Sequence, residues 1–212
     1  MSNRVEQLES LSEIRSLMEK SSKFISLSGL SGVAAGVFAL IGGSIVYLYL
    51  DISPFYSRAY YVADPSVVKW GMSYMTFFFV NAILIFVLAM ISGVYFTSRK
   101  AKNKGQKVWD ALSKRLLING MIPLVTGGIF CLGLIYHGMF GLVAPSTLIF
   151  YGLACINGSK YTLADIRYLG ILEIIIGLFA LFNIGYGLEF WIFGFGFLHI
   201  IYGTVMYYKY EK

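Results

Sequence analysis

The chain has 212 residues, of which 58% are hydrophobic and only 13% are charged. Soluble globular chains carry about 25% charged residues, so this sequence has too few charges to cover a surface that faces water. The composition therefore excludes an ordinary soluble domain and indicates an all-α integral membrane protein.

The apolar runs predict six transmembrane helices, each with the roughly 20 residues that a hydrocarbon core of about 30 Å requires. We expect them at 26–50, 70–96, 116–137, 142–160, 166–184 and 188–208. A polar segment, 1–23, precedes this domain of residues 24–212, and its polarity argues against a cleavable signal peptide. The other connections are an outer loop at 51–69, a basic loop at 97–115 and a capping box at 162–165 that opens the fifth helix.

Basic residues predict the orientation of the chain. Of the 17 Lys and Arg residues, all except Arg58 and Lys69 fall on the side of the two termini and the 97–115 loop. The positive-inside rule then places both termini in the cytoplasm of a bacterium, with the helices in its inner membrane. Topology accounts for the net charge of +6 without a nucleic-acid partner, and anionic lipid headgroups are the expected partner of residues 99–115.

Residues 4–20 have the spacing of an amphipathic helix, with an acidic polar face. We expect this helix to dock onto the basic segment 99–115 or onto a membrane-protein partner. A polar tail that is partly unfolded remains the alternative, and the sequence leaves a homo-oligomer open as well.

Short motifs recur through the chain and predict an internal repeat. GVFAL at 36–40, GIFCL at 128–132 and GLFAL at 177–181 match each other, as do ISG, ING and IYG in the even-numbered helices. Three helical hairpins are therefore expected, at about 26–96, 116–160 and 166–208. Glycine lets helices approach closely in lipid, whether within one chain or between chains. The predicted packing positions are Gly32, Gly36, Gly93, Gly128, Gly158, Gly177 and Gly203.

Two ionisable residues, Glu173 and His199, fall deep within apolar runs. Ionisable groups are costly in lipid and mark candidate functional sites. At about 1.5 Å per residue the two lie at depths that differ by roughly 6 Å, which one side chain or a water molecule bridges. We expect a pair that shares a proton and marks a proton or solute path, or an inert pair that fixes helix register. Asn81 is a further candidate for the same cavity.

The sequence lacks the usual signatures of enzyme chemistry. Its two histidines are too few for a multi-haem cytochrome, and Cys131 and Cys155 have neither C-x-x-C nor metal-site spacing. No G-x-S-x-G, H-E-x-x-H or P-loop motif is present. We therefore expect no catalytic residue, cofactor or metal, and interpret the chain as a non-enzymatic accessory, sensor or assembly component. A small proton-coupled transporter or channel is the alternative, and an intramembrane enzyme comes third.

Four segments carry a family resemblance: PLVTGGIF at 123–130, APSTLIFYG at 144–152, SKYTLADIRYLG at 159–170 and GFLHIIYG at 196–203. With these the chain resembles uncharacterised small six-helix membrane proteins of Bacteroidota, a resemblance that implies a six-helix fold and no particular activity. Its repeated glycine-rich hairpins are also loosely similar to those of HdeD-type acid-resistance membrane proteins.

Overall fold

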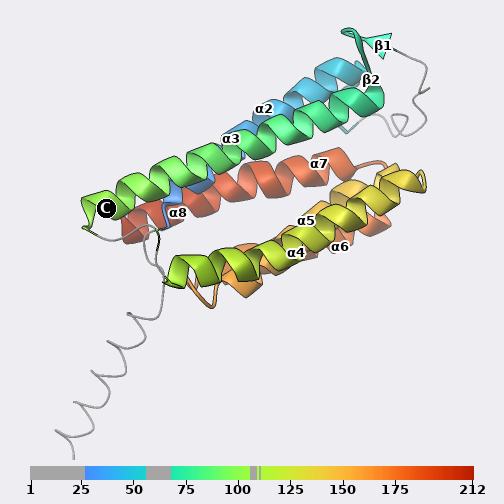
Figure 1. The fold of residues 1–212 in the computed structure, drawn as a ribbon. Coiled ribbons are helices and arrows are strands. Elements are labelled where there is room, and N and C mark those ends of the chain that lie inside the picture. The colour runs from blue at the N-terminus through green and yellow to red at the C-terminus, as the bar shows by residue number, and fades with distance from the viewer. Residues whose placement is uncertain (1–26, 56–67, 106–108, 110) are drawn as a thin grey trace, which may run out of the picture.

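The computed structural model describes residues 27–55, 68–105, 109 and 111–212 (Figure 1). The predicted amphipathic helix at 4–20 and residues 56–67 of the predicted outer loop lie outside the described residues. Helices dominate the described part. They are α2 (Gly29–Leu50), α3 (Tyr74–Asn103), α4 (Ala111–Tyr136), the short η2 (Phe140–Leu142), α5 (Val143–Gly158) and α6 (Ile166–Phe182), followed by one continuous last helix made of α7 (Gly187–Trp191), the π-helix η3 (Ile192–Leu198) and α8 (His199–Tyr210).

Five of these helical segments are long and apolar enough to cross a membrane: α2, α3, α4, the segment Phe140–Gly158 and the last helix. The sixth, α6, has 17 residues and spans about 26 Å, near the lower limit for a crossing. The described fold is therefore that of a helical membrane protein. Helix α3 continues to Asn103 and α4 already begins at Ala111, so most of the segment 97–115, expected as a loop, is helical.

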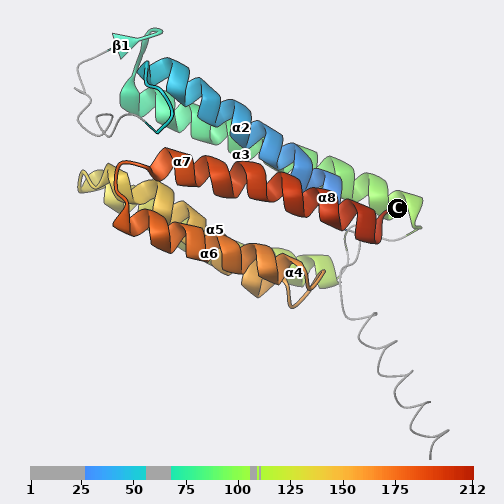
Figure 2. The same cartoon turned by 180° about the vertical axis from the view of Figure 1, so that it is seen from behind.

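The helices form two groups that the last helix joins. Figures 1 and 2 show α2 beside α3, and α4, α5 and α6 together, with the last helix between the two groups. Helix α2 packs against α3 and α8, while α5 packs against α4 and α6. Within the last helix, α7 contacts α5 and α6, and η3 contacts both α2 and α6. The last helix is thus the element through which the two groups meet.

Glycines allow the close helix crossings. A Cβ atom on Gly36 of α2 would lie 2.7 Å from the carbonyl oxygen of Gly196, and one on Gly32 would lie 3.2 Å from Cα of Gly203. Gly177 of α6 faces α5, and a Cβ atom on it would lie 3.0 Å from Pro145 O. Gly158 at the end of α5 faces α4, and a Cβ atom on it would lie 3.2 Å from a Leu116 methyl carbon. These glycines therefore pack within the chain.

Gly93 and Gly128 differ from the other predicted packing positions. A Cβ atom on either would meet nothing within 4 Å. The expected packing role is therefore not found at these two sites among the described residues, because both face away from the neighbouring helices.

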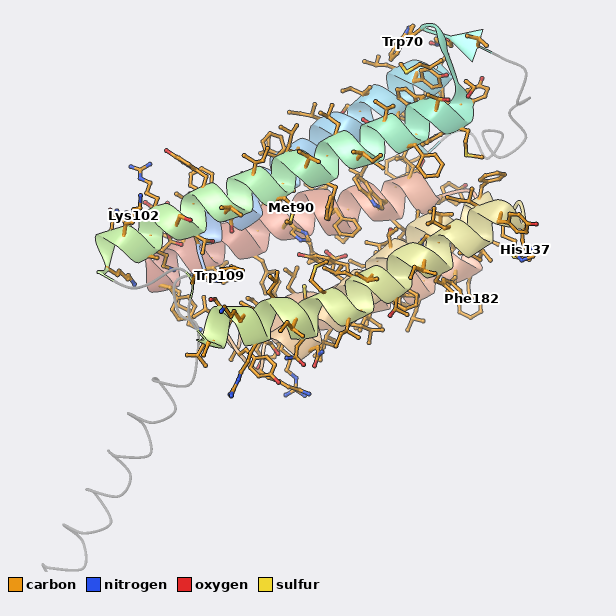
Figure 3. All side chains as sticks on the ribbon, viewed as in Figure 1. Trp70, Met90, Lys102, Trp109, His137 and Phe182 are labelled. Atoms are coloured by element: carbon orange, nitrogen blue, oxygen red, sulfur yellow. The ribbon has the colours of Figure 1, made fainter. Side chains whose placement is uncertain are left out.

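A hairpin and an aromatic cluster close one end of the α2–α3 pair. Strands β1 (Val68–Lys69) and β2 (Met72–Ser73) are antiparallel, and their turn residues Trp70 and Gly71 have positive φ angles of 53° and 74°. The hydroxyl of Tyr49, a fully buried residue, donates to Met72 O at 2.8 Å, and its ring stacks on Phe77 at 3.6 Å. In Figure 3, Trp70 lies at this end and Lys102 at the opposite end.

At the Lys102 end, the last residues of the chain bind the beginnings of two other helices. The Glu211 carboxylate accepts hydrogen bonds from the Ser28 hydroxyl and the Gly29 N–H at the start of α2, and lies 3.4 Å from Lys100 Nζ of α3. Lys209 contacts Asp165, the residue before α6, at 2.8 Å. The starts of α2 and α6, which belong to different groups, are therefore both held by residues at the end of the last helix.

Helix α6 begins at Ile166, so Asp165 and not Thr162 is the residue before the helix in the expected capping box at 162–165. Asp165 is the N-cap of α6 and makes no side-chain cap hydrogen bond. Its carboxylate instead accepts from Lys209 Nζ and the Tyr210 hydroxyl, each at 2.8 Å.

Candidate functional site at the centre of the bundle

The two deep ionisable side chains are in contact. Glu173 lies in the middle of α6 and is 0% exposed, and His199, the first residue of α8, is 5% exposed. Nδ1 of His199 lies 3.3 Å from Oε1 of Glu173. The offset in depth expected from the sequence is therefore spanned by the side chains themselves.

The local sequence of the last helix creates the space for this contact. Residues 192–198 read IFGFGFL, and their two glycines disfavour a regular α-helix. The chain forms a π-helix there, a form found often at functional sites. A Cβ atom on Gly194 would lie 2.5 Å from Glu173 Oε2 and 2.6 Å from a Leu148 methyl carbon. Only glycine at 194 leaves room for the carboxylate.

His199 uses both ring nitrogens. Nδ1 lies 3.0 Å from Gly194 O, and a carbonyl oxygen only accepts, so Nδ1 carries a proton in this geometry. Nε2 lies 2.7 Å from the Tyr151 hydroxyl of α5. The Cys155 thiol lies next to that hydroxyl, one helical turn further along α5. A polar row thus runs from Glu173 through His199 and Tyr151 to Cys155.

Aromatic rings enclose the imidazole. The Phe195 ring stacks on the His199 ring at 5.7 Å between centroids, and Tyr151 lies 5.0 Å from Phe195. The Trp191 ring lies 5.1 Å from the Phe195 ring. Tyr151 is half-buried, and Cys155, at the far end of the polar row, is buried.

The Glu173 carboxylate is less well satisfied than the imidazole. Within the part of the chain that the structure describes, neither of its oxygens has a hydrogen-bond partner, because the Nδ1–H bond of His199 is directed at Gly194 O. An unpaired charge is costly in such an apolar setting, which favours a pair with no net charge. A carboxylate beside an imidazolium and a carboxylic acid beside a neutral imidazole both meet this condition.

Asn81 does not belong to this site. Its side-chain Nδ2 donates to Gly42 O of α2 at 3.3 Å, so it links α2 to α3, whereas the Glu173–His199 pair lies among α5, α6 and the last helix. The structure therefore places the Asn81 amide at the α2–α3 contact and does not bring it to the Glu173–His199 pair. Its amide is used at a helix contact, where glycine exposes a backbone carbonyl.

Two open grooves are lined by described residues, and neither lining includes Glu173 or His199. One lies between α4 and α5, and the other between the start of α6 and α8. Among residues 27–55, 68–105, 109 and 111–212, no group of three or more His, Cys, Asp or Glu side chains is placed to hold a metal ion. The Glu173–His199 pair itself is buried in the interior of the described chain.

Sequence reasoning missed three members of the site: Tyr151, Cys155 and Gly194. Tyr151 and Cys155 are four residues apart on α5 and so share one face, and Gly194 precedes His199 by five residues. These spacings are weak signals, because tyrosine, cysteine and glycine are all common in apolar helices. The π-helix that aligns Gly194 with Glu173 has no clear pattern in the sequence.

Comparison of the chain with protein-family models, with curated proteins and with solved structures finds no match in any of the three. The resemblance to small six-helix membrane proteins of Bacteroidota stays a prediction. The case for function therefore rests on the geometry of the site.

Proposed function

We propose that this chain is a non-enzymatic integral protein of the bacterial cytoplasmic membrane that acts as an accessory or assembly component. The observation that carries the proposal is the burial of Glu173 and His199, with 0% and 5% exposure. A transport site has to meet water from at least one side, whereas a structural pair does not. Glu173–His199 then serves as a lock that holds the last helix against α5 and α6.

The position of the pair supports this role. The last helix is the element through which the α2–α3 group meets α5 and α6, and the pair joins that helix to α6. Apolar packing gives little specificity between helices in lipid, because lipid tails are as apolar as the side chains, whereas polar contacts fix register. A polar pair at this junction selects one arrangement of the two groups.

The orientation is part of the proposal. The start of α2 and the end of α8 meet at one end of the bundle through Glu211, and an even number of crossings is consistent with that. We place this end in the cytoplasm because the basic residues concentrate there. The three-hairpin ancestry and a partner bound through residues 4–20 belong to the same proposal.

Proton-coupled transport is the second candidate, and one observation favours it. Both oxygens of Glu173 lack hydrogen bonds within the described chain, and buried polar groups are rarely left so. The row through His199 to the half-buried Tyr151 would be a proton route if Glu173 exchanged its proton.

One experiment separates the two functions. The purified protein is reconstituted into liposomes that contain a pH-sensitive dye, and a valinomycin potassium potential drives proton entry. A lock predicts the proton flux of protein-free liposomes for wild type and for Glu173→Gln alike. Flux above that level in wild type, abolished in Glu173→Gln with the variant still folded, would overturn the lock and establish a proton path.

A further inference from the structure

We propose that the groove between α4 and α5 binds an anionic glycerophospholipid, with an acyl chain along its apolar wall and the phosphate at Arg115 and Lys160. The apolar lining comes mainly from Pro123, Phe150, Leu153 and Ile156, and Lys160 stands at one end. The groove is open along its length and has a volume of about 380 Å³. The proposal requires only that the chain spans a membrane, and it holds whichever function above is correct.

Pro123 shapes the α4 wall of the groove. Proline has no N–H, so the carbonyl oxygen of Asn119, four residues earlier, loses its usual partner in the helix. Asn157 of α5 replaces that partner, with Nδ2 donating to Asn119 O at 2.7 Å. The two helices are therefore pinned at the polar end of the groove, and the proline ring and Phe150 line it beyond that point.

Two cations flank this pinned end. Arg115 lies one helical turn before Asn119, whose side-chain amide donates to Arg115 O at 2.8 Å, and Lys160 follows Asn157 by three residues. Because α4 and α5 run antiparallel, the two cations belong to the same end of the groove. Both residues are exposed.

Neither of these cations forms an ion pair within the described part of the chain. Among the described residues the ion pairs of lysine join Lys69, Lys100 and Lys209 to carboxylates, and neither Arg115 nor Lys160 takes part in one. The second groove, beside α8, offers a contrast because its Lys209 is already paired with Asp165. A phosphate group supplies the missing negative charge, and guanidinium binds it in a bidentate manner.

An apolar groove that ends at the membrane boundary in two cations, neither paired with a described carboxylate, matches the shape and charge of one lipid class. A zwitterionic lipid would bring its own positive group to the cations, whereas phosphatidylglycerol brings a net negative charge. We therefore expect selectivity for phosphatidylglycerol over phosphatidylcholine at this groove.

The test is native mass spectrometry of the protein released from mixed micelles that hold equal amounts of the two lipids. Wild type should retain phosphatidylglycerol in preference to phosphatidylcholine. Arg115→Gln and Lys160→Gln should each reduce that preference about five-fold, the factor that corresponds to about 1 kcal/mol per basic residue. Lys212→Gln is the matched control: it removes an exposed cation at the same end of the bundle, after α8 and outside the groove lining, and should leave the preference unchanged.

A second variant tests the acyl-chain wall. Leu153→Trp fills the groove from a side chain that is 42% exposed, so the variant should fold, as size-exclusion elution and circular dichroism will show. It should lose retained phosphatidylglycerol although both cations remain. Equal retention of the two lipids by wild type would overturn the proposal, as would displacement of phosphatidylglycerol by millimolar inorganic phosphate, which would show a phosphate site without an acyl groove.

Discussion

Oε1 of Glu173 lies 3.3 Å from Nδ1 of His199, and the two side chains come from helices that no local contact would bring together. Each residue alone would place a costly ionisable group in an apolar interior. Together they need carry no net charge, so each makes the burial of the other tolerable. This mutual dependence is the physical basis of the lock.

Gly194→Ala should destabilise the protein. The added Cβ atom would lie 2.5 Å from Glu173 Oε2, and overpacking of this kind costs about 1–3 kcal/mol. Thermal unfolding of the detergent-solubilised protein measures the loss. Gly128→Ala is the control, because its Cβ atom meets nothing within 4 Å and alanine favours a helix. An equal loss in both variants would contradict the tight fit at Gly194.

Tyr151→Phe removes the partner of His199 Nε2, which lies 2.7 Å from the hydroxyl. Hydrogen bonds between membrane helices contribute about 1 kcal/mol or less, so the free energy of unfolding should fall by about that amount. Steric trapping in bicelles measures it. Tyr95→Phe removes a hydroxyl from a side chain that is 58% exposed and should have no effect. A Tyr151→Phe variant as stable as wild type would remove Tyr151 from the network.

The sequence predicted the six helical spans well because a bilayer demands about 20 consecutive apolar residues. Helix ends were harder to place. Helix α4 begins at Ala111 rather than at 116, since its first turn carries Lys114 and Arg115 and hydropathy reports contact with lipid, not helix formation. Hydropathy therefore does not detect polar helical turns that extend beyond the hydrocarbon core.

The site was predictable only in part. Glu173 and His199 stood out because ionisable residues are rare in apolar runs. Asn81 satisfied a similar argument, yet its amide bonds to Gly42 O of α2, because depth along a helix says nothing about the direction of the side chain. Tyr151 and Gly194 could not be chosen in advance, since their positions depend on the crossing of α5 with the last helix and on the π-helix.

Lys100→Met should weaken the contact that closes the Lys102 end of the bundle. Lys100 and Glu211 have side chains that are 5% and 11% exposed and lie 3.4 Å apart, and Lys100 Nζ also donates to Leu27 O at 2.6 Å. Hydrogen bonds to charged groups contribute about 2 kcal/mol, so the unfolding free energy should fall by about that much. Lys102→Met, at an exposed position two residues later, serves as the control. Faster hydrogen exchange at the Gly29 amide should accompany the loss, and an unchanged exchange rate would exclude the contact.

Asp165 should give the stability of the protein a pH dependence. Burial alone would raise its pKa, but hydrogen bonds from Lys209 and Tyr210 outweigh burial and hold the pKa below the ordinary value of 3.8. A carboxyl group of this kind stabilises the fold above its ordinary pKa, and the stabilisation is lost as pH falls through the lowered value.

Asp165→Asn checks this sign. Its unfolding temperature should lie below that of wild type by a constant amount at neutral and mildly acidic pH, and the difference should shrink as pH falls below 3.8. A difference that grew on acidification would contradict the lowered pKa of Asp165.

The most direct test of the lock is a double-mutant cycle on the free energy of unfolding, with Glu173→Gln, His199→Gln and the double variant. If the two residues stabilise the fold through each other, the loss in the double variant should be smaller than the sum of the single losses by about 1 kcal/mol or more. Losses that simply add would show that the residues act independently, and would contradict the lock.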